Sequence, residues 1–305
     1  MSFRTMHRLW SSILLFVLRT LGKLPLSVHY AFADFVSWLA GSVLHYRRDV
    51  VDINLARSFP DLKYAELKQI RKDFYRHFGE IFGEAIWFAG CTNPERLRKA
   101  RIVQLTNPEE LDRLYETTPS VFVLASHTGN WELIGGFYSY ADKFACKEND
   151  FAVVYKRLSS KVWDDVMKRS RISPIADKAG FDGIVETRTM MRYMVSHRSD
   201  RKIYDFITDQ HPYEGASGVD VGEFMHQPAR SMDGAAKLAA KFGMSVAYLG
   251  MDRVERGRYR LTVTTICDDA SSMSPEDIMK RYYQLLQRDL EANPSNYLWT
   301  HKRWK

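Results

Sequence analysis

Cysteine is scarce in this 305-residue sequence, which contains three. Cys91, Cys146 and Cys267 lie far apart, and none belongs to a C-x-x-C pair or has a histidine at zinc-ligand spacing beside it. This scarcity argues against a disulfide framework and against a structural zinc site, so we expect no metal. A chain of this kind is typical of the reducing cytosol.

Long apolar runs are also scarce. A membrane-spanning helix needs about 20 largely apolar residues. Residues 9–21 are too few and include Arg19, while residues 26–44 reach this length only by including His29, Asp34 and several serines. No small-residue cleavage site follows the first run, which argues against a cleaved signal peptide. Neither run is therefore a convincing transmembrane span, and the sequence favours a retained N-terminal anchor.

The sequence also lacks internal repeats, low-complexity tracts, an evident linker and the G-x-S-x-G motif that carries a serine nucleophile. Its composition, 45% hydrophobic and 27% charged, is typical of a globular protein of enzyme size. The simplest division is an N-terminal pair of amphipathic anchoring helices, residues 1–48, followed by one α/β domain, residues 49–305.

What the chain does have is an excess of positive charge. It contains 44 Lys and Arg against 37 Asp and Glu, a net charge of +7. This excess favours anionic partners, so nucleic acid, an anionic membrane surface and an acidic carrier protein are all compatible with it. Residues 1–48 have a single acid, Asp34, and six cations: Arg4, Arg8, Arg19, Lys23, Arg47 and Arg48.

The same N-terminal residues show helical periodicity. Trp10, Leu14, Leu18 and Leu21 recur at helical spacing, and a second set follows further along: Tyr30, Phe35, Trp38 and Leu39. Apolar faces flanked by cations are typical of helices that lie in the interface of an anionic membrane. The alternative is that these faces pack on the core of the protein itself.

The remainder of the chain alternates between two patterns. Apolar residues three or four apart predict a long helix over residues 64–88 that ends at Gly90. Strands are then expected at residues 101–105, 120–125, 151–155, 203–208, 245–251 and 259–266, and helices at 160–171, 183–195, 231–242 and 275–292. This alternation predicts an α/β fold with a mixed, mostly parallel sheet flanked by helices.

Titratable side chains directly follow one of these strands. The buried-strand run at residues 121–125 leads into Ser126-His127-Thr128-Gly129-Asn130-Trp131-Glu132, and ligand sites of open α/β sheets form at the carboxyl ends of strands. With His127 in the loop and Glu132 in the next helix, the carboxylate can bond one imidazole nitrogen while the other takes a proton. Gly129 permits a tight turn, and amides at the helix start can bind an anion.

Structural roles explain the same residues equally well. His127 can cap a helix and Glu132 can be a solvated acid of its first turn. The absence of H-E-x-x-H makes a zinc site a weaker interpretation still. Two further polar pairs end expected strands. Lys156-Arg157 is either an anion contact or a solvated strand end, and Asp209-Gln210 is either part of a site or an ordinary turn.

Six segments, which fall along the chain in the family's order, resemble the late acyltransferases of lipid A biosynthesis, which belong to the lysophospholipid acyltransferase superfamily. Residues 127–132 resemble the H-x-G-N-W-E form of the H-x4-D/E motif of glycerolipid-type acyltransferases. The other segments are Asn54-Leu55-Ala56-Arg57-Ser58-Phe59-Pro60, Val154-Tyr155-Lys156-Arg157, Thr208-Asp209-Gln210, Gln227-Pro228-Ala229 and the closing residues 299–305. The resemblance therefore covers nearly the whole chain.

The resemblance implies transfer of a fatty acyl group from an acyl-carrier-protein or acyl-CoA thioester to a hydroxyl of a lipid A precursor. It implies that His127 is the general base, that Glu132 orients it, and that no cofactor, metal or covalent enzyme intermediate is needed. It also implies a set of substrate-binding residues: Gly129, Asn130, Tyr155, Lys156, Arg157, Asp209 and Gln210. Because the family has Arg-Pro where this chain has Lys-Arg, the cation that binds phosphate or the oxyanion stays open.

The expected partners are a phosphorylated lipid acceptor, an acidic acyl donor and the anionic cytoplasmic face of the inner membrane, with no nucleic acid. Three other functions fit parts of the sequence. They are an acyltransferase for a different lipid, a thioesterase or lipid hydrolase, and a non-enzymatic basic protein that binds membranes or nucleic acid. The missing G-x-S-x-G motif disfavours the hydrolase.

Overall fold

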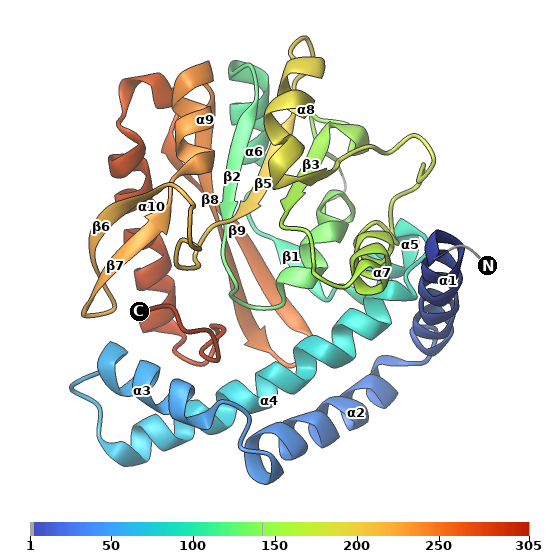
Figure 1. Cartoon of the computed structure of the whole chain (residues 1–305), viewed down its shortest axis with the longest axis vertical. Coiled ribbons are helices and arrows are strands. Elements are labelled where there is room, and N and C mark those ends of the chain that lie inside the picture. The colour runs from blue at the N-terminus through green and yellow to red at the C-terminus, as the bar shows by residue number, and fades with distance from the viewer. Residues whose placement is uncertain (1–2, 142, 305) are drawn as a thin grey trace.

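The computed structural model describes residues 3–141 and 143–304. Its centre is a seven-stranded sheet in the order β1-β9-β8-β2-β5-β3-β4 (Figure 1). Strands β8, β2, β5, β3 and β4 are parallel, whereas β9 is antiparallel to β8 and β1 is parallel to β9. The prediction of an α/β fold with a mixed, mostly parallel sheet flanked by helices is therefore confirmed. The strands of this sheet are β1 (Val103–Leu105), β2 (Val121–Ala125), β3 (Phe151–Tyr155), β4 (Ile184–Glu186), β5 (Ile203–Ile207), β8 (Ser245–Glu255) and β9 (Arg258–Cys267).

Helices surround the sheet, and a separate antiparallel pair, β6 (Gly218–Phe224) and β7 (Gln227–Met232), lies beside it. The α-helices are α1 (Phe3–Leu21), α2 (Leu26–Trp38), α3 (Arg48–Ser58), α4 (Tyr64–Ala89), α5 (Pro94–Ala100), α6 (Pro108–Thr117), α7 (Lys161–Arg171), α8 (Met190–Ser196), α9 (Gly234–Phe242) and α10 (Pro275–Ala292). The other helical segments are the π-helical η1 (Leu39–Val43) and the 3-10 segments η2 (Trp131–Ser139), η3 (Glu148–Asp150), η4 (Thr187–Thr189) and η5 (Ala270–Ser272).

β2 lies at the centre of the sheet, and all five of its side chains are buried. Phe122 and Leu124 belong to a core that includes residues of α9 and α10, whereas Val121, Val123 and Ala125 belong to a second core with residues of α5, α6 and η2. A strand covered on both faces needs a continuous apolar run, which is what its sequence supplies. Each buried Val, Leu or Phe side chain contributes about 1.5–3 kcal/mol to stability.

α4 crosses one end of the sheet, with α2 running beside it (Figure 1). Two glycines of α4 allow this close contact. A Cβ on Gly79 would lie 2.2 Å from the Ala33 carbonyl oxygen, and one on Gly83 would lie 2.7 Å from that of His29. The alternative that the N-terminal helices pack on the core of the protein therefore holds for one face of α2.

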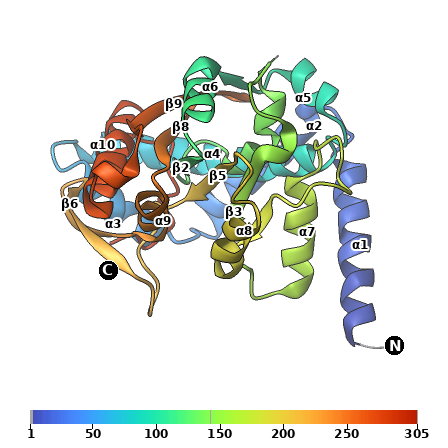
Figure 2. The ribbon, with the colours of Figure 1, turned by 90° about the horizontal axis from the view of Figure 1, so that it is seen from above.

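α1 lies along α7 at the edge of the molecule (Figure 2). In the part of the chain that the structure describes, no single helix is long and apolar enough to cross a membrane. Residues 6–21 and 26–43 are together long and apolar enough, but the two segments meet at a bend of 113°. The exposed apolar side chains of the two helices include Leu9, Trp10, Ile13, Phe16 and Val17 on α1 and Val28, Phe32, Phe35 and Trp38 on α2.

Two of the predicted helices are wrong at their starts. Residues 184–186, expected to be helical, form the edge strand β4, and residues 231–232 end β7. The first error has a clear cause, since Ile184 and Val185 pair with Val153 and Val154 of β3. Such pairing is decided by tertiary packing more than by local periodicity.

Candidate active site

The loop that follows β2 meets the loop that follows β5. These strands are parallel neighbours, with Ala125 beside Ile207 at their last pairing. The residues just beyond their ends therefore meet at one edge of the sheet. There the imidazole Nδ1 of His127 lies 2.7 Å from Oδ1 of Asp209.

Burial of the acid gives this contact its electrostatic character. The Asp209 side chain is 2% exposed and the His127 side chain 18% exposed. Burial alone would raise the pKa of Asp209, but the charge of His127 and the hydrogen bonds around the carboxylate outweigh it and lower that pKa. Asp209 is thus ionised near neutral pH, and the imidazole donates its Nδ1–H to it.

The other imidazole nitrogen is Nε2, which does not contact Asp209. With the proton on Nδ1, Nε2 carries the lone pair. The side-chain amide of Gln210 donates to Nε2 over 3.4 Å, and the Trp131 ring packs edge-on against the imidazole with centroids 5.0 Å apart. His127 is therefore held in the tautomer that can accept a proton at Nε2.

Residues 1–305 match the model of a family described as bacterial lipid A biosynthesis acyltransferase. The chain belongs to this family. The resemblance found in the six sequence segments is thereby confirmed, and the protein is an acyltransferase with an acyl donor and a lipid acceptor. No curated protein matches the chain.

Glu132 of this acyltransferase does not make the contact that its spacing predicts. Its carboxylate accepts two hydrogen bonds from the Arg171 guanidinium, at 2.9 and 2.8 Å, and one from the Trp131 indole at 3.2 Å. Glu132 lies in η2 and Arg171 at the end of α7, so the carboxylate turns toward α7. The partner that orients His127 is Asp209, and Glu132 reaches the imidazole only by way of Trp131.

Gly129 gives the loop its turn. Its φ is +56°, a left-handed conformation that glycine adopts readily, and a Cβ there would lie 2.7 Å from Cγ of Met251. The Gly129 amide is already bonded to the backbone and side-chain oxygens of Asn296. This residue therefore shapes the loop, and its N–H is not directed at a substrate.

Asn130 points away from His127. Its amide donates over 2.8 Å to Oε2 of Glu84, a fully buried acid of α4 that also accepts hydrogen bonds from Tyr259 and Tyr30. Burial raises the pKa of Glu84 to about 7 despite these hydrogen bonds. Asn130 is thus an anchor of the loop in a polar network that includes Tyr30 of α2.

The segment that follows α10 supports the same loop. The Leu298 amide donates to the His127 carbonyl over 3.2 Å, and Thr128 and Tyr297 form an isolated β-bridge. The buried Tyr297 hydroxyl also interacts with the Asp209 carboxylate. The Asn54 amide holds this segment in turn, through the carbonyls of Trp299 and His301, so two segments of the family resemblance meet in the fold.

Not every cation at the end of that segment is exposed to solvent. Arg303 is fully buried, with its guanidinium over the rings of Phe224 and Tyr283. Arg303 is therefore not a solvated charge, and Lys305 lies outside the described residues.

Tyr155 ends β3, which pairs with β5, and Lys156 and Arg157 follow it, so all three lie at the same edge of the sheet as Asp209. Their contacts are with other neighbours. The Lys156 ammonium lies over the Tyr213 ring, that of Lys168 lies over Tyr155, and Arg157 is half exposed and 3.9 Å from Asp164. The structure gathers these residues near the candidate site without bonding them to it.

Sequence reasoning missed Arg171 and Tyr297, and it expected Glu132 rather than Asp209 as the direct partner of His127. Arg171 ends a helix and Tyr297 lies in an irregular segment, so neither carries a local signal of a site. No group of three or more His, Cys, Asp or Glu side chains that could hold a metal ion occurs among the residues the structure describes.

Proposed function

We propose that this acyltransferase moves a fatty acyl chain from an acyl-carrier-protein or acyl-CoA thioester to a hydroxyl of a phosphorylated lipid A precursor, with His127 as the general base. The observation that carries the proposal is the Asp209–His127 contact, which leaves Nε2 as the basic nitrogen of the imidazole. Residues 49–305 form the catalytic domain in this proposal.

The proposed reaction is a direct transfer. Nε2 of His127 takes the proton of the acceptor hydroxyl while its oxygen forms a bond to the thioester carbonyl carbon. Asp209 stabilises the imidazolium that results. The tetrahedral intermediate then collapses, the carbon–sulfur bond breaks, and the departing thiolate takes the proton from the imidazolium. The products are the acylated lipid and the free thiol.

Other residues of the site have supporting roles in the proposal. Gln210 gives up its long hydrogen bond to Nε2 when the acceptor hydroxyl arrives, and its amide is then placed to hold the acceptor or the oxyanion. Lys156 and Arg157 supply the cationic rim for a phosphate group of the donor or acceptor. Glu132 positions Trp131 against His127 through its fixed bond to Arg171.

Residues 1–48 attach the protein to the cytoplasmic face of the inner membrane in this proposal. Exposed apolar side chains on α1 and α2 lie beside cations such as Arg8 and Lys23, the pattern of interfacial helices. Sedimentation with anionic phospholipid vesicles tests this. Replacing Trp10 and Phe16 with serine is expected to weaken sedimentation at least about tenfold, and Val254→Ser, an equally exposed control elsewhere, is expected to leave it unchanged.

The catalytic proposal is tested with purified protein, a lipid A precursor and an acyl-carrier or acyl-CoA thioester. His127→Ala is expected to abolish formation of acylated lipid with an unchanged urea midpoint. His226→Ala removes an exposed histidine on the β6–β7 turn and serves as the matched control. Undiminished transfer by His127→Ala would remove His127 from the mechanism, and release of free fatty acid without acylated lipid would favour a thioesterase.

A further inference from the structure

The segment that follows α10 contains a buried cation without a hydrogen-bond partner. Arg303 is fully buried, and Nε, Nη1 and Nη2 of its guanidinium make no hydrogen bond of ordinary geometry to residues 3–141 and 143–304. Removing a charge from water destabilises the fold unless a partner compensates, and arginine cannot avoid this penalty by losing its proton. A charge that is kept here against stability therefore calls for an explanation in terms of function.

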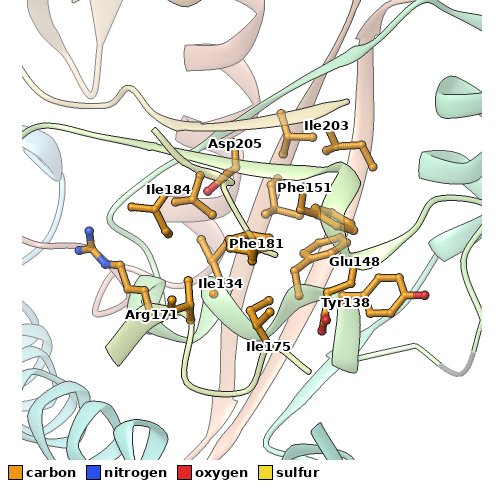
Figure 3. Close-up of a pocket in the computed structure, with 16 residues that line it drawn as sticks. Ile134, Tyr138, Glu148, Phe151, Arg171, Ile175, Phe181, Ile184, Ile203 and Asp205 are labelled. Carbon is orange, nitrogen blue, oxygen red and sulfur yellow. The ribbon is translucent and has the colours of Figure 1, made fainter. Parts of the chain in front are cut away.

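Other buried charged groups of the chain avoid this penalty. Figure 3 shows Arg171 at the margin of a pocket, where its guanidinium donates two hydrogen bonds to the Glu132 carboxylate. Asp205 lines the same pocket and its Oδ1 has no hydrogen bond, but burial raises the pKa of this carboxyl to about 7, so it can bind a proton. Arg303 has neither remedy.

Two aromatic rings lie against the Arg303 guanidinium. Its Cζ is 5.0 Å from the centroid of the Tyr283 ring and 5.8 Å from that of Phe224. The face of an aromatic ring attracts a cation, most strongly where water is excluded. Burial alone would lower the pKa of the guanidinium, but Tyr283, Tyr297 and the charge of Asp209 outweigh it and raise that pKa. Arg303 is therefore held as a cation within the electrostatic reach of Asp209.

The tyrosines beside Arg303 also hold Asp209. The Tyr283 hydroxyl donates over 3.4 Å to the carbonyl of Thr208, the residue before Asp209. The buried Tyr297 hydroxyl interacts with the Asp209 carboxylate itself. One cluster thus contains the unpartnered guanidinium, both tyrosines and the acid of the candidate site.

Arg303 is the buried cation among the titratable groups on which the Asp209 carboxylate acts. Besides His127, these groups are Tyr282 and Tyr283 of α10 and Tyr297, His301 and Arg303 of the segment that follows it. Burial raises the pKa of each of the three tyrosines and lowers that of His301 to about 4, so all four are neutral near neutral pH. Arg47, which acts on His301, is exposed, so solvent screens its charge.

Resting on the proposed role of His127 as the general base, we infer that Arg303 is a positioning residue for that base and acts through Asp209. Its charge holds the Asp209 carboxylate ionised and in place, and it disfavours a second positive charge on the imidazole. His127 is thereby kept in the neutral form that accepts the proton of the acceptor hydroxyl. The same charge helps the imidazolium to pass this proton to the departing thiolate. Arg303 is fully buried and does not itself touch substrate.

A pH profile separates this role from a structural one. Arg303→Met removes the charge and keeps an apolar side chain of similar length against the rings. Because the positive charge opposes protonation of the His127–Asp209 pair, its removal is expected to move the acid limb of kcat/KM to higher pH by about 0.5–1 pH unit, which lowers kcat/KM at acid pH about 3- to 10-fold. Arg303→Lys keeps a charge and is expected to return most of the limb. Lys302→Met removes the exposed neighbouring cation and is the matched control, with an unchanged limb.

Titration of the histidine rings tests the same charge without requiring transfer. The full-length protein is labelled with ¹⁵N in its nine histidines, and the signals of His127 are those lost in His127→Ala. The pH midpoint of these signals belongs to the His127–Asp209 pair. It is expected to rise in Arg303→Met by the same amount as the acid limb, about 0.5–1 pH unit, and to stay unchanged in Lys302→Met.

The two measurements keep this inference apart from the proposed function. A raised midpoint in Arg303→Met, in a protein that transfers no acyl chain, supports the action of Arg303 on the pair and removes the proposed function. Transfer that requires His127, with an unchanged limb and midpoint in folded Arg303→Met, supports the proposed function and overturns the role of Arg303. Arg303→Gln is the second neutral variant. Failure of both neutral variants to fold, as judged by urea titration, would assign Arg303 to stability and also overturn the inference.

Discussion

Replacing Asp209 with asparagine changes the contact at the centre of the candidate site. The carboxylate accepts the Nδ1–H of His127 over 2.7 Å and is almost fully buried, so solvent screens it little. A hydrogen bond to a charged group contributes about 1.5–3 kcal/mol. Its loss in the transition state, where the imidazole is positively charged, corresponds to a fall in kcat of about 10- to 150-fold.

Asparagine at position 209 has a second effect, which enlarges the expected fall in kcat. Its amide can donate to Nδ1, which places the imidazole proton on Nε2, the nitrogen that must be free to act as a base. The same change in a Ser-His-Asp enzyme lowers kcat by about 10⁴-fold. We therefore expect a fall of between about 10² and 10⁴ in kcat, with a smaller change in KM because Asp209 is too buried to touch substrate.

The assay follows release of the free thiol from the acyl donor under saturating lipid acceptor. Asp268→Asn, an exposed acid paired with Arg113, is the matched control and is expected to keep full activity. Urea unfolding of each variant checks that the fold is intact. Activity of Asp209→Asn within threefold of the wild type, together with loss of activity in Glu132→Gln, would refute the reasoning and return the orienting role to Glu132.

Three further predictions concern stability. Arg171→Met leaves the partly buried Glu132 carboxylate without its cation and is expected to lower the free energy of unfolding by about 3 kcal/mol, part of which Glu132→Gln in the same chain restores in urea titrations. Burial raises the pKa of Asp205 to about 7, so this carboxyl binds its proton more tightly in the folded state. The free energy of unfolding therefore falls as pH rises from about 4 through about 7, by on the order of 4 kcal/mol in all. Asp205→Asn is expected to remove this fall when unfolding is compared at pH 5 and pH 8. Gly129→Ala puts a Cβ at positive φ against a methionine side chain and is expected to lower the melting temperature and the activity. Gly215→Ala, at positive φ with nothing within 4 Å, should cost only the backbone strain of about 1–2 kcal/mol.

Local sequence patterns were sufficient for much of the fold. β2 is a continuous apolar run and α4 is strongly periodic, so their types follow from the side chains that must be buried. The order of the strands does not follow in this way. β5 lies beside β2 although β3 and β4 separate them in the chain, and only packing of the whole domain decides that.

The same limit applies to the site. The residues after β2 and β5 were both recognisable as polar groups at strand ends, but their contact depends on the order of strands. The spacing of His127 and Glu132 predicted a bond between them because both lie in one short motif. Arg171, which is far away in the sequence, offers Glu132 a bidentate charged partner instead.

The support beneath His127 has a consequence for how the protein is made. Asn296 and Leu298 hold the backbone of the loop, yet they are synthesised after every strand and helix of the domain. Domains begin to fold from the N-terminus during synthesis, so α1, α2 and α4 emerge from the ribosome well before the loop gains this support. A message truncated before codon 296 would therefore yield a chain that can fold much of its sheet but cannot fix its histidine. Synthesis of residues 296–298 is then itself the step that completes the support of the reaction centre.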